Sequence, residues 1–314
     1  MKMQKIGIVG CGNVGATIAY TVMQSRLFSE IVLIDKNEEK ARSEVMDLSH
    51  CLSFVAPMSI YQGTYEKLHD AGIVVVAAGA NQEDGEDRLS LAEKNAKIIG
   101  DIVPRIAAVN KECIILLVTN PVDILSYEAY RLSGFDSNRI IGSGTVLDSG
   151  RLKYLVGERL NVDHRNVHTF IIGEHGDSEL AVWSSANISG IDLDDYLHVC
   201  GARMGDLYGM YESVVSSAYE IIRGKGATYY AIAQAALRII RSIVRDENTI
   251  LPVSALVSGQ YGIDDVYLSV PCVVGKGGVK HILEIPLNDD ENARLQKSAA
   301  QLRQVLDRLS FAVV

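Results

Sequence analysis

The sequence predicts an α/β fold in which a six-stranded, doubly wound parallel sheet is followed by a mixed α+β domain. Three observations predict it. Apolar strand patterns alternate with helical patterns as far as residue 143, a glycine-rich turn follows the first strand, and the helices become longer beyond that point. We therefore expect one domain at residues 1–143 and a second at residues 144–314. Because no linker rich in Pro, Gly or Ser separates them, the two should share a tight interface.

The individual elements follow from the apolar periodicity. Short apolar runs predict the strands of the first domain near residues 5–9, 31–34, 58–61, 73–76, 114–117 and 140–142. Apolar residues spaced three or four apart predict its helices near 14–25, 37–49, 88–109 and 122–132. The second domain is predicted to hold a helix at 147–160, a strand at 167–172, helical stretches at 192–223 and 228–245, a twisted antiparallel region at 250–285 and a terminal helix at 288–309.

The turn after the first strand has the G-x-G-x-x-G spacing, with Gly10, Gly12 and Gly15. The first glycine makes a tight turn, the second lets the backbone approach a pyrophosphate, and the third lets the helix pack on the strand. The pyrophosphate would lie at the N-terminus of the helix that begins near Asn13. Asp35 ends the second strand, where an acid binds ribose hydroxyls and repels a 2′-phosphate, so this Rossmann pattern favours NAD. The alternative is a glycine turn that binds no nucleotide.

The composition argues against several classes of partner. The formal net charge is −9, and no basic run is long enough to follow a nucleic acid backbone. No apolar run approaches the length of a membrane span, and the first strand begins too early to leave room for a signal peptide. The five cysteines are odd in number and widely spaced, which is typical of free thiols in a reducing compartment. We expect a cytoplasmic protein without a metal site.

One histidine lies where chemistry is expected. His175 follows a β-run and is flanked by glycines, so its side chain can face a cleft. Asp148 and Arg151 lie one turn apart on a helix of the second domain. Asp148 can bind one ring nitrogen of the histidine while the other exchanges a proton with a substrate, and Arg151 can grip a carboxylate with two hydrogen bonds. The alternatives are a structural histidine and an ordinary ion pair within a helix.

Two further polar sets follow strands of the first domain, at the edge of the sheet where ligands bind in doubly wound folds. The loop at residues 78–88 contains glycine and ends in Arg88, whose charge could reach a polarised carbonyl when the loop closes. Asn120 ends the fifth strand and offers an amide at the same edge. A solvated loop of charges and a common Asn-Pro turn are the alternative interpretations.

Taken together, these motifs resemble the bacterial L-lactate dehydrogenases of the lactate and malate dehydrogenase superfamily. The resemblance extends from Lys5 almost to the C-terminus and is carried by residues 10–15, 78–82 with Arg88, 119–123, 147–151, 173–177 and 226–230. It implies reversible, NADH-dependent reduction of pyruvate to L-lactate. It also implies a homotetramer that works in glycolysis and fermentation.

The resemblance implies a role for each matching residue. His175 would donate and accept the proton, Asp148 would orient it, and Arg151 would clamp the substrate carboxylate. Arg88 would polarise the reacting carbonyl. Asn120 would bind the substrate and Thr228 would line its pocket. Besides Gly10, Gly12, Asn13 and Gly15, the family's cofactor contacts fall on Val14, Asp35, Lys40, Tyr65, Gly79, Ala80, Val118, Asn120 and Ser143.

Gln82 is expected to set the choice of substrate. Malate dehydrogenases carry arginine at this position, because a dicarboxylate brings a second negative charge. A neutral glutamine leaves that charge unpaired, so oxaloacetate should be rejected in favour of pyruvate. Glu83 and Asp84 replace the lysine and proline common in bacterial relatives, which leaves open a broader dehydrogenase of bulkier 2-oxo acids. Gly150 stands where alanine is usual.

The remaining predictions concern regulation and the rival functions. Bacterial relatives often bind fructose 1,6-bisphosphate between subunits through residues that align with Lys153 and His168. Lysine lacks the guanidinium fork, so the phosphate would be held more weakly. The alternative is a solvated lysine and a histidine that starts a buried strand. A non-catalytic nucleotide-binding protein is the other rival, although it would tolerate loss of residues that this chain keeps.

Overall fold

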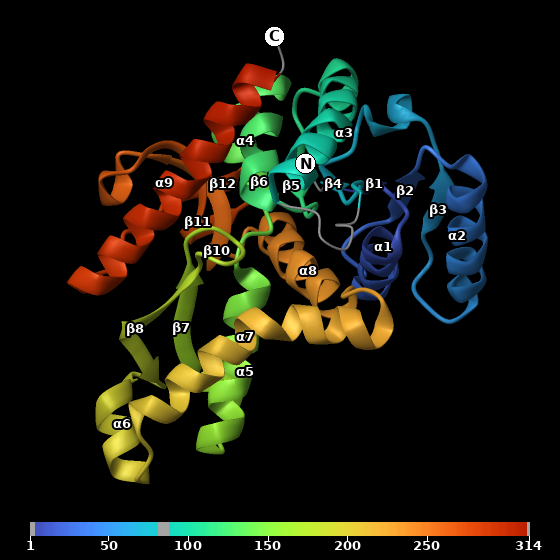
Figure 1. The fold of residues 1–314 in the computed structure, drawn as a ribbon. Helices are drawn as coiled ribbons and strands as arrows, with labels where there is room; N and C mark the ends of the chain where they lie inside the picture. The colour runs from blue at the N-terminus through green and yellow to red at the C-terminus, as the bar shows by residue number, and fades with distance from the viewer. Residues whose placement is uncertain (1–3, 81–87, 313–314) are drawn as a thin grey trace.

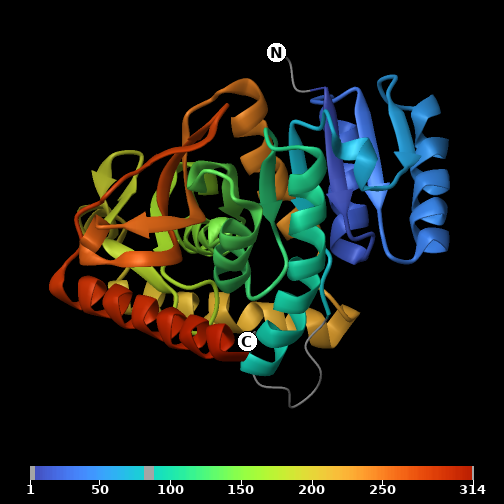
Figure 2. The same cartoon turned by 90° about the horizontal axis from the view of Figure 1, so that it is seen from above.

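The computed structural model describes residues 4–80 and 88–312. A nine-stranded sheet runs through the molecule in the order β12-β11-β10-β6-β5-β4-β1-β2-β3, and a separate three-stranded sheet has the order β7-β8-β9. Seen from above, the strands and helices of the N-terminal part form one end of the molecule, and the smaller sheet lies toward the other end (Figure 2).

Six parallel strands form one part of the large sheet. They are β1 (Lys5–Val9), β2 (Glu30–Ile34), β3 (Ser59–Gln62), β4 (Ile73–Val76), β5 (Ile114–Leu117) and β6 (Ile140–Gly142). The order 3-2-1-4-5-6 reverses between β1 and β4, the point where doubly wound folds bind their ligands. Most residues of these strands are buried, because helices cover both faces of the sheet.

Four helices connect these strands: α1 (Asn13–Ser25), α2 (Glu38–His50), α3 (Arg88–Val109) and α4 (Val122–Ser133). Helix α3 packs on α4, and α1 packs on α8 (Tyr230–Arg245), so the two pairs cover opposite faces (Figure 1). Local chemistry explains the ends. The side chain of Asn37 caps α2 by accepting a hydrogen bond from the N–H of Lys40 at 3.0 Å, and Gly134 ends α4 in the left-handed conformation.

The antiparallel region extends the parallel sheet instead of forming a sheet of its own. Strands β10 (Thr249–Ser258), β11 (Asp264–Gly275) and β12 (Gly278–Ile282) follow β6, and Ser254 pairs with Gly142 where the two parts meet. A Cβ on Gly142 would lie 2.7 Å from the Cβ of Ser254, so this junction needs glycine. The two predicted domains thus share one continuous sheet.

The small sheet and three helices enclose a second apolar core. Strands β7 (Val167–Ile172), β8 (Leu180–Ile188) and β9 (Ile191–Asp192) are antiparallel. Helices α5 (Val146–Leu160), α6 (Leu193–Cys200) and α7 (Met204–Lys225) contribute to the core with them. The terminal helix α9 (Asp289–Ala312) packs on β8, β11 and α4. Within the part of the chain that the structure describes, no helix is both long enough and apolar enough to span a bilayer.

The predicted fold class is confirmed, and three details differ. Strand β8 was not predicted, because its exposed and buried residues do not alternate cleanly and a bulge between His168 and Phe170 shifts its register with β7. The predicted helical stretch at 192–223 is two helices, since Gly201 takes a φ of 72° and ends α6. The predicted twisted region at 250–285 adds strands to the main sheet.

Candidate active site

The glycine turn after β1 is shaped by close backbone contacts. Gly10 has a φ of 99°, and a Cβ on Gly15 would lie 1.8 Å from the carbonyl oxygen of Gly10, so the helix packs against the turn only with glycine there. By contrast, a Cβ on Gly12 would meet nothing within 4 Å. No side chain caps α1 at Gly12. The start of α1, which includes Asn13 and Val14, therefore offers backbone N–H groups beside open space, as a bound phosphate requires.

Asp35 lies at the end of β2, close to this turn. One of its oxygens accepts a hydrogen bond from the N–H of Cys11 at 2.6 Å, and the other accepts one from the N–H of Asn37 at 2.9 Å. These bonds fix the carboxylate, and an ionised carboxylate has about four lone-pair positions, so acceptor capacity is left for ribose hydroxyls. Lys40 is in the first turn of α2, and Tyr65 follows β3, where its ring lies 5.5 Å from the guanidinium of Arg105.

A buried asparagine connects the loops that follow β4 and β5. The side chain of Asn95, on α3, accepts a bond from the N–H of Ala80 at 2.7 Å and donates to the carbonyl of Asn120 at 2.7 Å. A Cβ on Gly79 would lie 2.3 Å from a methyl group of Thr119, so the two loops are packed tightly. Asn95 was not singled out in the sequence. It holds together two of the predicted contact regions.

The segment that carries His175 is anchored by main-chain bonds to distant parts of the fold. Gly173 exchanges two backbone hydrogen bonds with Ser269 on β11, of 2.9 and 3.1 Å. The N–H of His175 donates to Oδ2 of Asp123 at 2.8 Å, and the hydroxyl of Ser269 donates to the other oxygen of that carboxylate at 3.2 Å. Burial raises the pKa of Asp123 to about 6, although hydrogen bonds to it act in the opposite direction. Asp123 is thus a positioning residue that sequence reasoning missed.

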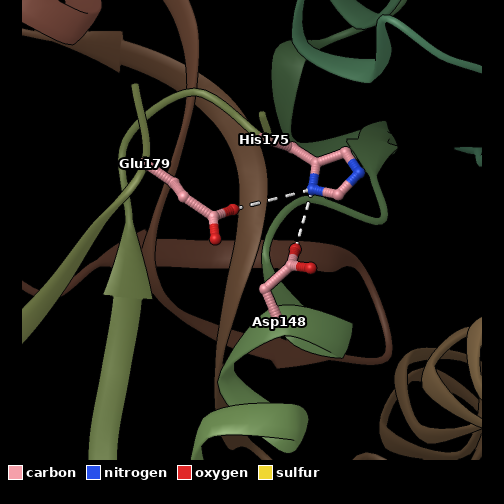
Figure 3. A group of neighbouring side chains, drawn as sticks. All are labelled: Asp148, His175 and Glu179. Atoms are coloured by element: carbon pink, nitrogen blue, oxygen red, sulfur yellow. Dashed lines mark hydrogen bonds and ion pairs between the residues drawn. The ribbon is translucent and has the colours of Figure 1, made fainter. Parts of the chain in front are cut away.

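Asp148 holds both His175 and Arg151. Its Oδ2 lies 2.7 Å from Nδ1 of the imidazole, and its Oδ1 lies 2.9 Å from Nη1 of the guanidinium (Figure 3 shows the histidine contact). The carboxylate is buried, while the imidazole is 24% exposed. Burial alone would lower the pKa of His175, but the negative charge and hydrogen bond of Asp148 raise it to about 9. The same contacts hold the pKa of Asp148 below its usual value against the opposing effect of burial.

A third carboxylate lies beside the same ring. Oε2 of Glu179 is 4.0 Å from Nδ1 of His175 (Figure 3). Burial, and next the charge of Asp148, raise the pKa of Glu179 to about 8. The ligand atoms of these three residues lie within 4.8 Å of one another, close enough for a metal ion. A shared cation would have to displace the short hydrogen bond between His175 and Asp148, so we interpret the group as a proton-holding cluster.

Three further predicted residues are described by the structure. Val118 and Ser143 are buried beyond the ends of β5 and β6, and Thr228 is half-buried between α7 and α8. Arg88 is the first residue of α3, and Gln82 lies outside the described residues. The side chain of Arg88 also lies outside the part of the chain that the structure describes.

The predicted effector residues lie on neighbouring elements. Lys153 is on α5, and its ammonium group is 5.6 Å from the centre of the Phe170 ring. Burial lowers the pKa of this lysine. His168 is exposed on β7, two residues before Phe170, and the register shift against β8 lies between the two.

Known protein families match both halves of the chain. The model of the lactate/malate dehydrogenase NAD binding domain matches residues 4–142, and that of the alpha/beta C-terminal domain matches residues 145–311. The chain belongs to the lactate/malate dehydrogenase family. Its predicted cofactor, NAD, is confirmed by the first match, and the open, uncapped start of α1 fits that cofactor's pyrophosphate.

Individual members of the family are similar over the full length. An L-lactate dehydrogenase of Acetivibrio thermocellus is 52% identical over 312 residues, which is 98% of this chain and 98% of that one. L-lactate dehydrogenase 1 of Clostridium acetobutylicum is 49% identical over 98% of this chain and 99% of its own. Among solved structures, MGS-M5, a lactate dehydrogenase from a Medee basin deep-sea metagenome library, has a TM-score of 0.96 at 43% identity and covers 99% of this chain and all of its own.

Proposed function

We propose that this protein is an L-lactate dehydrogenase that reversibly reduces pyruvate to L-lactate with NADH. The observation that carries the proposal is the arrangement of His175, Asp148 and Arg151, in which one buried carboxylate holds a proton donor and a carboxylate-binding cation together. The relatives that are about half identical over the full chain are L-lactate dehydrogenases, which supports the same reaction.

In the proposed mechanism, His175 exchanges its proton with the substrate oxygen through Nε2, because Nδ1 is occupied by Asp148. The imidazolium is stabilised by that carboxylate, so the acid is present at neutral pH. Arg151 uses one N–H for Asp148 and presents others of its five donors to the substrate carboxylate. When bound, NADH supplies the hydride that C2 of pyruvate receives. Lactate oxidation needs the opposite, neutral state of His175.

The roles proposed for the loop at residues 78–88 rest on residue type. Arg88 would place its positive charge at the carbonyl that is being reduced. Gln82, being neutral, would leave the second carboxylate of oxaloacetate unpaired, so pyruvate would be preferred. A dehydrogenase of larger 2-oxo acids is the second candidate, favoured by Glu83 and Asp84 in that loop. Malate dehydrogenase is the least favoured.

The direct test is to mix the purified protein with NADH and pyruvate and to determine the configuration of the product. We expect NADH oxidation that depends on pyruvate, and a product that is L-lactate. Formation of D-lactate, or no oxidation above the rate without pyruvate, would contradict the proposal. The same assay with NADPH should be much slower, because Asp35 would repel the 2′-phosphate.

The domain division and the assembly belong to the same proposal. The boundary at residues 143 and 144 is supported by the two family matches, which end at 142 and begin at 145.

Several large side chains are exposed on α7 and α8, namely Tyr208, Tyr219, Ile221, Ile222 and Tyr230, and subunit contacts would cover them. We propose a homotetramer, testable by light scattering. We also propose a cytoplasmic, fermentative role, in keeping with the five free cysteines.

Fructose 1,6-bisphosphate is proposed as an effector that binds through Lys153 and His168. The ammonium of Lys153 lies over the ring of Phe170, two residues along β7 from His168. Titrating the bisphosphate against the pyruvate saturation curve tests the proposal, with Lys153→Met as the variant. We expect the effector to lower the pyruvate KM of the parent protein only. An unchanged curve for the parent protein would contradict the site.

A further inference from the structure

A second buried carboxylate approaches the nitrogen of His175 that does not face the substrate. Glu179 is 4% exposed, and its Oε2 lies 4.0 Å from Nδ1. Figure 3 shows its carboxylate and that of Asp148 directed at the same nitrogen, one from the segment before β8 and the other from α5. The distance is too long for a hydrogen bond but well within the range of a charge interaction.

The position of Glu179 is fixed by the surrounding fold. Its N–H donates to the carbonyl of Gly176 at 3.2 Å, and its carbonyl accepts a bond from the hydroxyl of Tyr211, on α7, at 2.5 Å. The next residue, Leu180, pairs with Ile172 at the start of the β7–β8 ladder. The backbone is thus held on both sides, and the buried carboxylate lies beside the ring.

The other charged groups around the imidazole determine how strongly the Glu179 carboxylate acts on it. Asp148 and Arg151 face the histidine from α5, Asp123 faces its main chain from α4, and Tyr211 lies on α7 behind Glu179. Glu174, in the same segment, binds Ser178. Burial raises the pKa of Tyr211 to about 12, so the phenol is neutral. The described groups facing the ring therefore include two carboxylates at Nδ1, and Arg151 binds only one of them.

The imidazolium, and after it the guanidinium of Arg151, offset the charge of the second carboxylate. Burial disfavours an ionised Glu179, yet its charge is tolerated when His175 is protonated a few ångströms away. As pH rises, Glu179 ionises and makes the loss of the histidine proton harder. The two groups consequently titrate as a pair rather than independently.

We propose that Glu179 is a positioning residue that extends, to higher pH, the range in which His175 keeps its proton. This inference rests on the proposed function, since the proton concerned is the one that His175 gives to pyruvate. Asp148 orients the ring and Glu179 adds charge at the same edge without taking its hydrogen bond. Neither group touches the substrate.

The test is a titration of His175 followed by NMR of histidine-labelled protein, with the signal assigned from its absence in His175→Asn. The histidine pKa should be lower in Glu179→Gln than in the parent by roughly one pH unit or more, because an opposite charge within 4–6 Å is lost. The NMR titration needs no turnover, so its result tests the role of Glu179 separately from the proposed activity. An unchanged pKa would overturn the inference.

Two further variants distinguish the effect of the Glu179 charge from a general structural effect of the substitution. Glu174→Gln is the matched control, because it removes another buried carboxylate of the same segment, one that binds Ser178. It should shift the histidine pKa much less, and an equal shift would overturn the specific role of Glu179. Glu179→Asp keeps the charge but withdraws it by one methylene, so an intermediate pKa is expected.

The kinetic counterpart is the pH profile of kcat/KM for pyruvate. In Glu179→Gln, the ratio to the parent value should fall as pH rises above about 8, with the descending limb displaced toward lower pH. A purely structural role would instead lower the rate by the same factor at every pH, and parallel profiles would count against the proposal.

Discussion

Nδ1 of His175 lies 2.7 Å from Oδ2 of Asp148, and the other oxygen of that carboxylate binds Arg151. A single buried side chain therefore sets the orientation of the proposed acid and of the proposed carboxylate clamp. The distance between His175 and Arg151 is therefore set by α5 and by the loop after β7, and both are anchored in the fold.

Removing the imidazole should abolish the chemistry and spare cofactor binding. In His175→Asn, we expect turnover to fall by roughly 100- to 10,000-fold, the usual contribution of a general acid. The glycine turn and Asp35 are on other elements, so NADH should still bind. Stopped-flow or steady-state rates, with NADH affinity from fluorescence, check both parts. Near-normal turnover would show that another group delivers the proton.

The two directions of the reaction should respond oppositely to pH. The pKa of His175 is raised from 6.5 to about 9, so the proton is held at neutral pH. Pyruvate reduction should be steady near pH 7 and should fall as pH rises through about 9, whereas lactate oxidation should increase over that range. Initial rates from pH 6 to 10 test this. A reduction rate that falls near pH 6.5 would mean that the carboxylates do not hold the proton.

The same shift has a consequence for stability. Because the folded pKa is above the unfolded one, the contribution of His175 is fully present below about 6.5 and is lost as pH rises through about 9. Asp148→Asn should remove this dependence along with most turnover. Urea unfolding at pH 6 and pH 9 measures it, and an equal pH dependence in both proteins would contradict the assignment.

Local sequence patterns predicted much of the fold and the sets of polar residues. They did not predict residues whose roles depend on contacts with distant parts of the chain. The strands and helices near β1, α1 and β2 could be predicted because apolar runs and glycines are local signals. Asn95, Asp123 and Glu179 could not, since what they do depends on groups that only folding brings close. Asp123, for example, binds a main-chain N–H that lies 52 residues further along the chain. One signal was available: Asp123 ends the motif at residues 119–123 and lies in the first turn of α4.

Changing the loop glutamine should change the substrate. Gln82→Arg adds a cation that can pair with the second carboxylate of oxaloacetate, so preference should move from pyruvate toward oxaloacetate. An unpaired buried charge costs roughly 3–5 kcal/mol, which sets the largest change expected. The ratio of kcat/KM for the two acids measures it. Gln82→Met, which adds no charge, is the control, and an equal ratio in both variants would contradict the charge argument.

A glycine in the middle of α5 should be replaceable with a gain in stability. A Cβ on Gly150 would meet nothing within 4 Å, and alanine is favoured over glycine in helix interiors by about 1 kcal/mol. Gly150→Ala should therefore raise the midpoint of urea unfolding. Gly157→Ala is the contrast in the same helix, because its Cβ would lie 2.9 Å from the carbonyl oxygen of Val162. A gain in both, or in neither, would show that the space around them does not decide the result.

The central claim is tested most directly by measuring kcat/KM for pyruvate, oxaloacetate and 2-oxoisocaproate in parallel, from the loss of NADH absorbance. The account predicts that pyruvate leads clearly, because Arg151 binds one carboxylate and the neutral Gln82 offers no partner for a second. A higher value for oxaloacetate would contradict the role given to Gln82, and a higher value for 2-oxoisocaproate would show that the enzyme is a dehydrogenase of larger 2-oxo acids.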